Sequence, residues 1–229
     1  GGVAILSAIF DTFDIEHMRV SSSALREGLL YDLLGRIHDE DVRDQTVAEL
    51  VDRYSIDRGQ SHRVFETAGA LWQQIAEEWD IAEDDLKQLL RWASALHEIG
   101  SAISHSQYHK HGGYLLAHLE MPGFSRGEQR RLAVLVRSHR RKFPLSEFKS
   151  LSETVREKTE KLCVLLRLAV VLHRRRSAAT VPDIKIRVEE DKIRLRFPSS
   201  WLDDHQLTTA DLEQESAYLK NAGYRLKIR

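Results

Sequence analysis

The sequence has a single cysteine, Cys163, among its 229 residues. One cysteine excludes a disulfide framework, so we expect a protein of the reducing cytoplasm. Cys163 lies in the apolar run 162–172, where burial raises the pKa of a thiol. We therefore expect it to be a structural residue and not a nucleophile.

Long apolar runs are also missing. None approaches the roughly 20 residues that a membrane helix needs, which predicts no membrane span. The chain has no secretory signal and no initiator methionine, since it opens on Gly1-Gly2-Val3. From that opening we expect a piece of a longer protein.

An excess of charge of either sign is missing as well. The net charge is −1, with 30% charged and 42% hydrophobic residues, a balance typical of a globular protein. The total charge gives no hint of a polyanion partner, so local clusters must be considered instead.

The first 36 residues contain three short apolar segments. Residues 3–13 suit a helix or a buried segment, residues 15–20 suit a short strand, and residues 24–35 have the spacing of an amphipathic helix. This stretch is too short to close a core of its own.

From about Asp41 the apolar spacing is helical. One face recurs over 64–75 and another over 86–97, and Gly100 is well placed to end the second of these helices. Residues 161–173 are apolar nearly all round, which predicts a central, buried helix.

A further helix is expected after Ser125. Ser125 and Glu128 have the spacing of a capping box, in which each side chain binds the other residue's backbone N–H. The apolar residues Leu132, Leu135 and Val136 then fall on one face with His139.

The pattern changes at Pro182. Residues 184–188 and 193–197 alternate apolar and basic side chains, which predicts two half-buried strands in a hairpin. A helix over 210–221 and an alternating strand over 224–228 should follow, giving a ββαβ unit.

We therefore expect a mainly α protein. Residues 37–176 should form a multi-helix domain and residues 177–229 a small α+β domain, with the boundary in the small residues 177–180.

Residues 95–100 read Ala-Leu-His-Glu-Ile-Gly, which is similar to the phrase A-x-L-H-D-I-G of the helical HD superfamily of metal-dependent phosphohydrolases. Such a site needs an upstream histidine, the His-Asp doublet and a later aspartate, brought together by helix packing. His62 suits the first position and His97 the second. Glu98 replaces the aspartate, and its extra methylene moves the carboxylate by about 1.5 Å, whereas ligand distances tolerate only a few tenths of an ångström.

The last expected metal ligand is missing. The phrase that resembles R-L-A-D reads Arg167-Leu168-Ala169-Val170, and valine cannot bind a metal. We expect a degenerate HD site at His62, His97, Glu98 and Val170 that holds no metal, with both histidines hydrogen-bonded in the core. The alternative, a metal-dependent HD-type nucleotide phosphohydrolase, stays open because another histidine could serve as a ligand.

A second histidine cluster spans 105–111. His105 and His109 face the same way if this segment is helical. The cluster contains no carboxylate, so its imidazoles suit phosphate oxygens better than a metal. The alternative is a polar helix end with no ligand.

Basic residues close two of the expected helices, at 137–142 and at 173–176. A helix dipole alone favours cations there, yet two such clusters in a near-neutral chain indicate an anion-binding surface. Tyr108 and Phe143 are the only aromatic residues close by for stacking bases. Nucleic acid is therefore not expected as a partner, and RNA binding is a weaker, third hypothesis.

Several motifs in order along the chain resemble the C-terminal half of bacterial exopolyphosphatases, a family that includes guanosine pentaphosphate phosphohydrolases. They cover nearly the whole chain and lie at 22–31, 90–100, 105–111, 135–141 and 224–228.

The resemblance implies a truncated enzyme. Residues 1–36 would be the tail of an actin-like catalytic region that holds Mg²⁺ and the catalytic carboxylate, so no catalytic residue and no cofactor is expected in this chain. The remainder would be an HD-like domain and a small α+β domain, which in the family form a dimer interface and a basic channel for polyphosphate.

By position, the phosphate-contacting histidine pair of the family falls on His105 and His109, and its basic contact falls on Arg141, with Arg137 and Arg140 beside it. We expect the polyphosphate-binding and dimerising portion of an exopolyphosphatase, inactive alone. Its full-length parent would hydrolyse the terminal phosphate of inorganic polyphosphate or of guanosine pentaphosphate. Its partners would be polyphosphate, a second copy of the chain and its own catalytic region.

Overall fold

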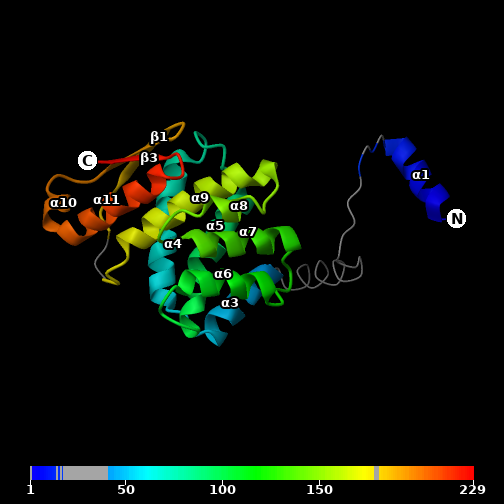
Figure 1. Cartoon of the computed structure of the whole chain (residues 1–229), viewed down its shortest axis with the longest axis horizontal. Coiled ribbons are helices and arrows are strands. Elements are labelled where there is room, and N and C mark those ends of the chain that lie inside the picture. Colours follow the sequence, from blue (N-terminus) through cyan, green and yellow to red (C-terminus); the bar gives the residue numbers. More distant parts are fainter. Residues whose placement is uncertain (1, 14, 16, 18–40, 178–180) are drawn as a thin grey trace. The chain divides into compact units, whose positions relative to one another are not determined.

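The structure, a computed structural model, describes residues 2–13, 15, 17, 41–177 and 181–229 (Figure 1). The chain divides into two compact units, Gly1–Glu40 and Asp41–Arg229. The strand expected over 15–20 and the helix expected over 24–35 fall outside the described residues, apart from Ile15 and His17, which belong to no regular element.

In the first unit, helix α1 spans Gly2–Phe13 and confirms the helical alternative for residues 3–13. The other alternative, a buried segment, stays a prediction, because most of this unit lies outside the described residues. Val3, Ile5 and Phe13 are exposed, and no residue of α1 is buried.

The second unit begins with a helical part. Its elements are α3 (Val42–Arg53), α4 (Arg58–Ile75), α5 (Asp84–Leu96), the 3-10 helix η1 (Ile99–Ala102), α6 (Tyr108–His118), α7 (Arg126–Ser138), α8 (Leu145–Phe148) and α9 (Glu153–Leu172). None of the described helices is long and apolar enough to cross a membrane.

Helix α7 begins as its sequence predicts. The Ser125 hydroxyl accepts a hydrogen bond from the Glu128 backbone N–H at 3.2 Å, and the Glu128 carboxylate accepts one from the Ser125 N–H at 2.8 Å. This capping box satisfies two backbone donors that the first turn of a helix leaves free. The predicted start of the helix is confirmed.

Helix α9 is the central helix of the unit. Leu162, Leu165 and Leu168 are fully buried, and the helix packs against α4, α5, α7 and α11. The prediction of a central helix over 161–173 is confirmed, and the helix begins eight residues earlier than predicted. Cys163 is buried in it, and that burial raises the pKa of the thiol to about 12.

The end of α5 differs from the prediction. The helix stops at Leu96, and Gly100 lies inside η1 and not at a helix cap. A Cβ at residue 100 would lie 2.0 Å from the Tyr108 carbonyl oxygen and 2.3 Å from the Gly112 nitrogen. Glycine is needed here because α6 passes too close for any side chain, a tertiary reason that spacing along the chain does not reveal.

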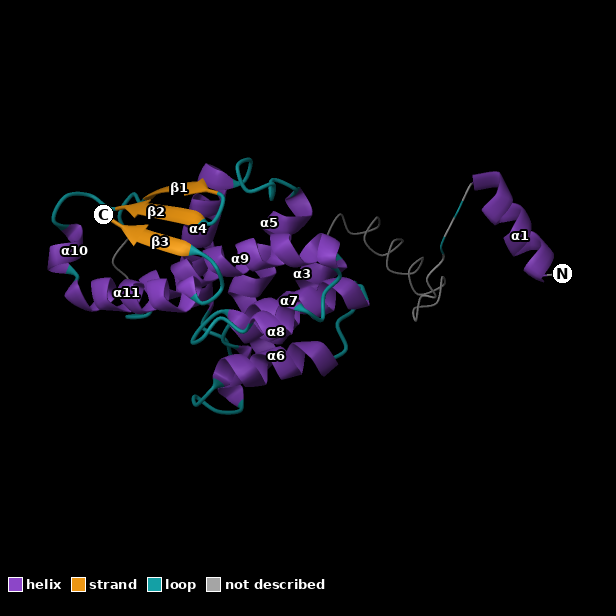
Figure 2. Ribbon diagram, turned by 45° about the horizontal axis from the view of Figure 1, so that its top comes forward, coloured by secondary structure: helices purple, strands orange, loops and turns teal. Residues whose placement is uncertain are grey.

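The C-terminal part carries a three-stranded sheet in the order β1-β2-β3 (Figure 2). Strands β1 (Lys185–Glu189) and β2 (Lys192–Arg196) form the predicted antiparallel hairpin, and β3 (Arg225–Ile228) pairs parallel to β2. Helices α10 (Trp201–Asp204) and α11 (Gln206–Lys220) connect β2 to β3. The ββαβ prediction is confirmed.

One face of the sheet closes the core. Ile186, Ile193, Leu195 and Leu226 are buried, β1 packs against α4, and β3 packs against α11. The structure is thus mainly α with a small α+β part, as predicted. Residues 41–229 form one compact unit, and the boundaries at 36 and 176 stay predictions.

Candidate anion-binding site

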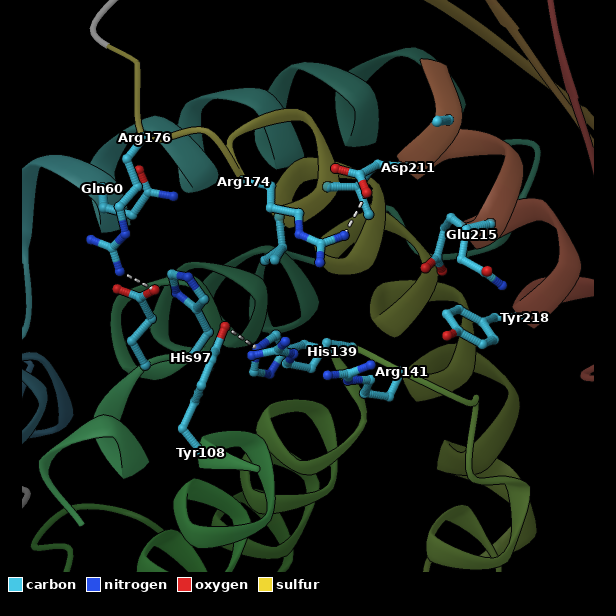
Figure 3. Close-up of a pocket in the computed structure, with 16 residues that line it drawn as sticks. Gln60, His97, Tyr108, His139, Arg141, Arg174, Arg176, Asp211, Glu215 and Tyr218 are labelled. Atoms are coloured by element: carbon cyan, nitrogen blue, oxygen red, sulfur yellow. Dashed lines mark hydrogen bonds and ion pairs between the residues drawn. The ribbon is translucent and has the colours of Figure 1, made fainter. Parts of the chain in front are cut away.

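A cavity of about 570 Å³ lies between the helical part and α11 (Figure 3). We call it the arginine cavity, because four of its lining residues are arginines. Its lining comprises Gln60, His97, Glu98, Tyr108, His139, Arg140, Arg141, Val170, Val171, Arg174, Arg176, Ala210, Asp211, Gln214, Glu215 and Tyr218.

The degenerate HD site is brought together only in part. His97, Glu98 and Val170 all line the arginine cavity. His62 does not, because it is exposed on α4 and lines a second cavity of about 420 Å³ with His173. The expectation that His62 joins the other three as a core histidine is therefore wrong, and Gln60 reaches the arginine cavity from the same helix.

Two buried histidines form one wall of the cavity. His97 Nδ1 lies 2.7 Å from the Ser94 carbonyl oxygen, and His139 Nδ1 lies 2.7 Å from the Val136 carbonyl oxygen. A carbonyl can only accept, so in each ring Nδ1 carries the proton. The prediction that His97 is a hydrogen-bonded core histidine is confirmed.

These two rings are neutral. Burial lowers the pKa of His97 and lowers that of His139 well below its ordinary value. The rings meet edge to face with their centroids 5.4 Å apart, and the Tyr108 hydroxyl lies 3.5 Å from His139 Nε2. With Nδ1 protonated, each Nε2 is an acceptor, and neither ring can donate from it to a phosphate oxygen.

The carboxylate of Glu98, which would be the metal ligand of an HD site, is occupied by an ion pair. Arg176 binds this carboxylate (Figure 3). Arg176 also lies 3.1 Å from the Asp57 carboxylate. Val170 supplies no ligating atom. Among the described residues, no group of three or more His, Cys, Asp or Glu side chains is arranged to hold a metal ion. The residues of the cavity therefore do not fit a divalent metal.

The other two acids at the cavity are also paired with arginines. Asp211 lies 2.5 Å from Arg174 on the rim (Figure 3). Glu215 lies 2.5 Å from Arg167 at the base, and both side chains of that pair are almost fully buried. Each of the three carboxylates is thus paired with an arginine, and Glu98 shares Arg176 with Asp57.

Arg167 is a positioning residue that the sequence interpretation missed. Besides Glu215, its guanidinium donates to the carbonyl oxygens of Ser138 and Arg141. It thereby ties the end of α7 to α11 through α9. The phrase Arg167–Val170 was interpreted only as a lapsed ligand motif, because the partner Glu215 is 48 residues away and has no spacing signal.

Two arginines of the cavity keep their charge uncompensated. The Arg140 guanidinium lies over the Tyr108 ring, 4.5 Å from its centroid. Arg141 is exposed with φ of +64°, and its carbonyl accepts from Arg167. Neither forms an ion pair with a carboxylate of the described residues, so the cavity carries net positive charge where they meet.

The remaining predicted phosphate contacts lie outside the cavity. His105 is exposed in the turn before α6, and α6 begins only at Tyr108, so the helix that would have given His105 and His109 a shared face does not include His105. His109 is buried, its Nδ1 lacks a partner among the described residues, and burial with the Arg137 charge lowers its pKa to about 4. Arg137 lies 3.5 Å from the Glu147 carboxylate.

Comparison with known proteins identifies one family, and the family model and the individual relatives agree. A family model described as "Ppx/GppA phosphatase, domain III" matches residues 42–216. Proteins named "Guanosine-5'-triphosphate,3'-diphosphate pyrophosphatase" are similar over 99% of this chain, at 35% identity in Aeromonas hydrophila and 37% in Pseudoalteromonas translucida. A protein of the same name in Vibrio cholerae is also 37% identical over 99% of the chain. The chain spans 45–46% of the length of these relatives.

Proposed function

Because the chain belongs to the Ppx/GppA phosphatase family, we propose that it is the C-terminal, phosphate-chain-binding part of a phosphoanhydride hydrolase. The observation that carries this proposal is the arginine cavity, where Arg140 and Arg141 have no carboxylate partner among the described residues while all three lining acids are neutralised. A cavity of that kind attracts a flexible polyanion.

Similarity to these relatives supports guanosine pentaphosphate as the substrate of the whole enzyme. The names of those relatives specify a guanosine 5'-triphosphate that carries a 3'-diphosphate. Inorganic polyphosphate, the substrate first expected from the sequence, also consists of phosphates joined by phosphoanhydride bonds. In both ligands, two phosphate oxygens can accept hydrogen bonds from one planar arginine guanidinium at the same time.

The binding contacts are assigned to Arg140 and Arg141, with Tyr108 orienting Arg140 from below. Arg167 acts through these residues by fixing the backbone at Ser138 and Arg141. His109 is too buried and too weakly basic to carry a positive charge at neutral pH. Its part is to pack α6 against α7 beneath the cavity.

The rest of the proposal concerns the whole enzyme. Hydrolysis and its Mg²⁺ belong to an N-terminal catalytic region that the 229 residues do not include, and the chain alone does not hydrolyse either substrate. The working form is a homodimer in the cytoplasm, in which the catalytic region and this chain hold one phosphate chain between them. Many weak contacts along such a chain raise its effective concentration at the active site.

The proposal is tested by direct binding. Labelled polyphosphate and guanosine pentaphosphate are titrated with the purified chain at 50 mM and 200 mM salt. The Arg140→Ala, Arg141→Ala double variant is expected to bind about tenfold more weakly or worse, because two charge-assisted contacts are lost. The double variant should also show a shallower dependence of affinity on salt, as expected when fewer counterions are released.

The matched control is Arg126→Ala, Arg130→Ala, which removes two exposed arginines of α7 away from the cavity. It should bind like the unchanged chain. If neither ligand binds at low salt, or if both double variants lose affinity equally, the binding role is wrong. Sedimentation velocity of the chain tests the dimer separately.

A further inference from the structure

The outer face of the sheet is almost entirely basic. Nine side chains point away from the core on the three strands and the residue after β3, and eight of them are Lys or Arg. We call these eight the basic sheet face: Lys185, Arg187, Lys192, Arg194, Arg196, Arg225, Lys227 and Arg229. The ninth is Glu189. In a chain with 34 basic and 35 acidic residues, this segregation is not what an ordinary solvated strand surface shows.

The strand register places these cations beside one another. Arg187 lies opposite Arg194, and Arg194 lies beside Lys227. Lys185 lies opposite Arg196 in the next row, and Lys192 lies beside Arg225 on the other side. Hydrogen bonds from Arg229 N–H to the Leu195 carbonyl and from Phe197 N–H to the Arg229 carbonyl continue the row at Arg196.

Like charges directly opposite in a sheet destabilise it, and few acids compensate for them here. Glu189 pairs with Arg194, Asp191 with Arg225, and Asp183 with Lys185. Arg187, Arg196, Lys227 and Arg229 form no ion pair with a carboxylate among the described residues, whereas Lys192 lies opposite Glu189 and interacts with the charges of Glu189 and Asp191. The cations of the basic sheet face therefore repel one another in the folded chain, and a bound polyanion would neutralise that repulsion.

We propose that the basic sheet face docks a nucleic-acid duplex through its phosphate backbone. Three strands and five residues give a face of about 10 Å by 17 Å, which spans the roughly 6 Å minor groove of a duplex. Cations on opposite edges of the face therefore reach the phosphates of both strands at once. A duplex carries about one negative charge per 1.7 Å of its axis, a density that a block of cations captures by releasing counterions.

The two-dimensional shape of the face favours a duplex over other phosphate polymers. Single-stranded nucleic acid is usually held by aromatic side chains that stack on bases, and none of the nine outward positions is aromatic. Inorganic polyphosphate is a single line of charge, which a groove or a cavity matches better than three parallel rows. The expectation that nucleic acid is not a partner was drawn from the histidine and arginine clusters, which this face does not include.

The face is also independent of the arginine cavity. None of its eight cations lines that cavity. Their attachment to α4 and α11 through the buried side of the sheet holds the rows rigid. The docking site therefore stands whether or not the cavity binds a phosphate chain.

The test is fluorescence anisotropy of a labelled 20-base-pair duplex (roughly two helical turns) titrated with the full chain between 20 and 200 mM KCl. The sheet variant is Arg187→Gln, Arg194→Gln, Lys227→Gln, and the control variant is Arg126→Gln, Arg130→Gln, Lys149→Gln. Each takes the net charge from −1 to −4. The sheet variant should lose at least about tenfold in affinity, and its salt slope should fall by about 2.7, or 0.9 for each phosphate contact.

Three results would overturn the proposal. The first is that the unchanged chain does not bind the duplex at 20 mM KCl. The second is that the sheet and control variants lose the same affinity for the duplex. The third is that the sheet variant no longer binds labelled polyphosphate but still binds the duplex. Retained polyphosphate binding with weakened duplex binding supports it. Circular dichroism confirms that the sheet variant is folded.

Discussion

The arginine cavity and the basic sheet face both gather positive side chains, but they differ in how those charges are compensated. At the cavity, the lining residues Arg174 and Arg176 and the buried Arg167 beneath them each have a carboxylate partner, so the net positive charge is confined to Arg140 and Arg141. On the sheet, most cations are exposed and stand beside other cations.

The difference follows from burial. A charge removed from water costs several kcal/mol unless it is paired and hydrogen-bonded, so the buried Arg167 requires Glu215. An exposed charge is solvated and screened within about 8–10 Å at physiological salt, so rows of arginines survive without partners. The cavity can therefore select a ligand by geometry, whereas the sheet offers charge with little selectivity.

The largest expected effect comes from breaking the buried pair. Arg167→Met leaves Glu215 uncompensated and the Ser138 and Arg141 carbonyls without their donor. Loss of one partner of a buried ion pair costs about 3–5 kcal/mol. Urea denaturation should show a fall of that size in the free energy of unfolding.

The controls separate burial from pairing. Arg174→Met removes an arginine of the same cavity whose pair with Asp211 is exposed, and it should cost no more than about 1 kcal/mol. The Arg167→Met, Glu215→Leu double variant should recover a large part of the loss, because no unpaired charge stays buried. Equal costs for Arg167→Met and Arg174→Met would contradict the contrast.

A second effect is expected in the pH dependence of stability. Burial lowers the pKa of His97 and His139, and it lowers that of His109 and His173 to about 4. Below pH 6.5 the unfolded chain binds protons that the folded chain excludes. Stability is therefore complete above pH 6.5 and falls as the pH decreases, by up to about 1.4 kcal/mol per pH unit for each group.

Chemical denaturation at pH 7, 6 and 5 measures this slope, and comparison with a histidine variant isolates the imidazole contribution from that of Glu160 and Glu215, whose pKa values burial raises. His139→Gln should reduce the slope by about one proton, whereas His105→Gln, at an exposed position, should leave it unchanged. The basic sheet face contains no histidine, so its variant should keep the full slope. A slope that does not depend on His139 would contradict the assignment of neutral buried rings.

Local patterns predicted much of this fold. The capping box at Ser125 and Glu128 and the alternation of residues 184–188 and 193–197 each depend on neighbours within a few residues, and both are confirmed. The phrase that resembles the HD motif also marked part of the site, since His97 and Glu98 line the arginine cavity. Spacing along the chain is enough to predict an element when the hydrogen bonds that form it involve the backbone of nearby residues.

Long-range contacts were not predictable in the same way. His62 was placed by its order along the chain, but the orientation of α4 turns it toward a different cavity. Arg167 and Glu215 meet only because α9 packs against α11. The three rows of the sheet face become one surface only through the parallel pairing of β2 with β3, which no residue pattern specifies.

A smaller effect is expected from releasing an arginine that is already present in the cavity. Asp211→Asn keeps the shape of the side chain but frees Arg174, so the cavity gains one uncompensated cation. An exposed pair contributes about 0.2–1 kcal/mol, so the affinity for labelled polyphosphate should rise by up to about fivefold. Asp183→Asn, which frees Lys185 on the sheet, is the control and should leave the affinity of the cavity unchanged.

The smallest expected effect concerns the stability of the sheet itself. Arg187 and Lys227 flank Arg194 from both sides, and all three charges repel one another. Neutralising the outer two with Arg187→Gln and Lys227→Gln should leave the free energy of unfolding unchanged or raise it by up to about 1 kcal/mol at low salt, since like charges opposite one another destabilise a sheet by about that much or less. The gain should vanish at 1 M salt, where the Debye length is about 3 Å. A clear loss of stability would mean that these side chains are held by packing and not by an external partner, and the rows of cations would then need no polyanion to explain them.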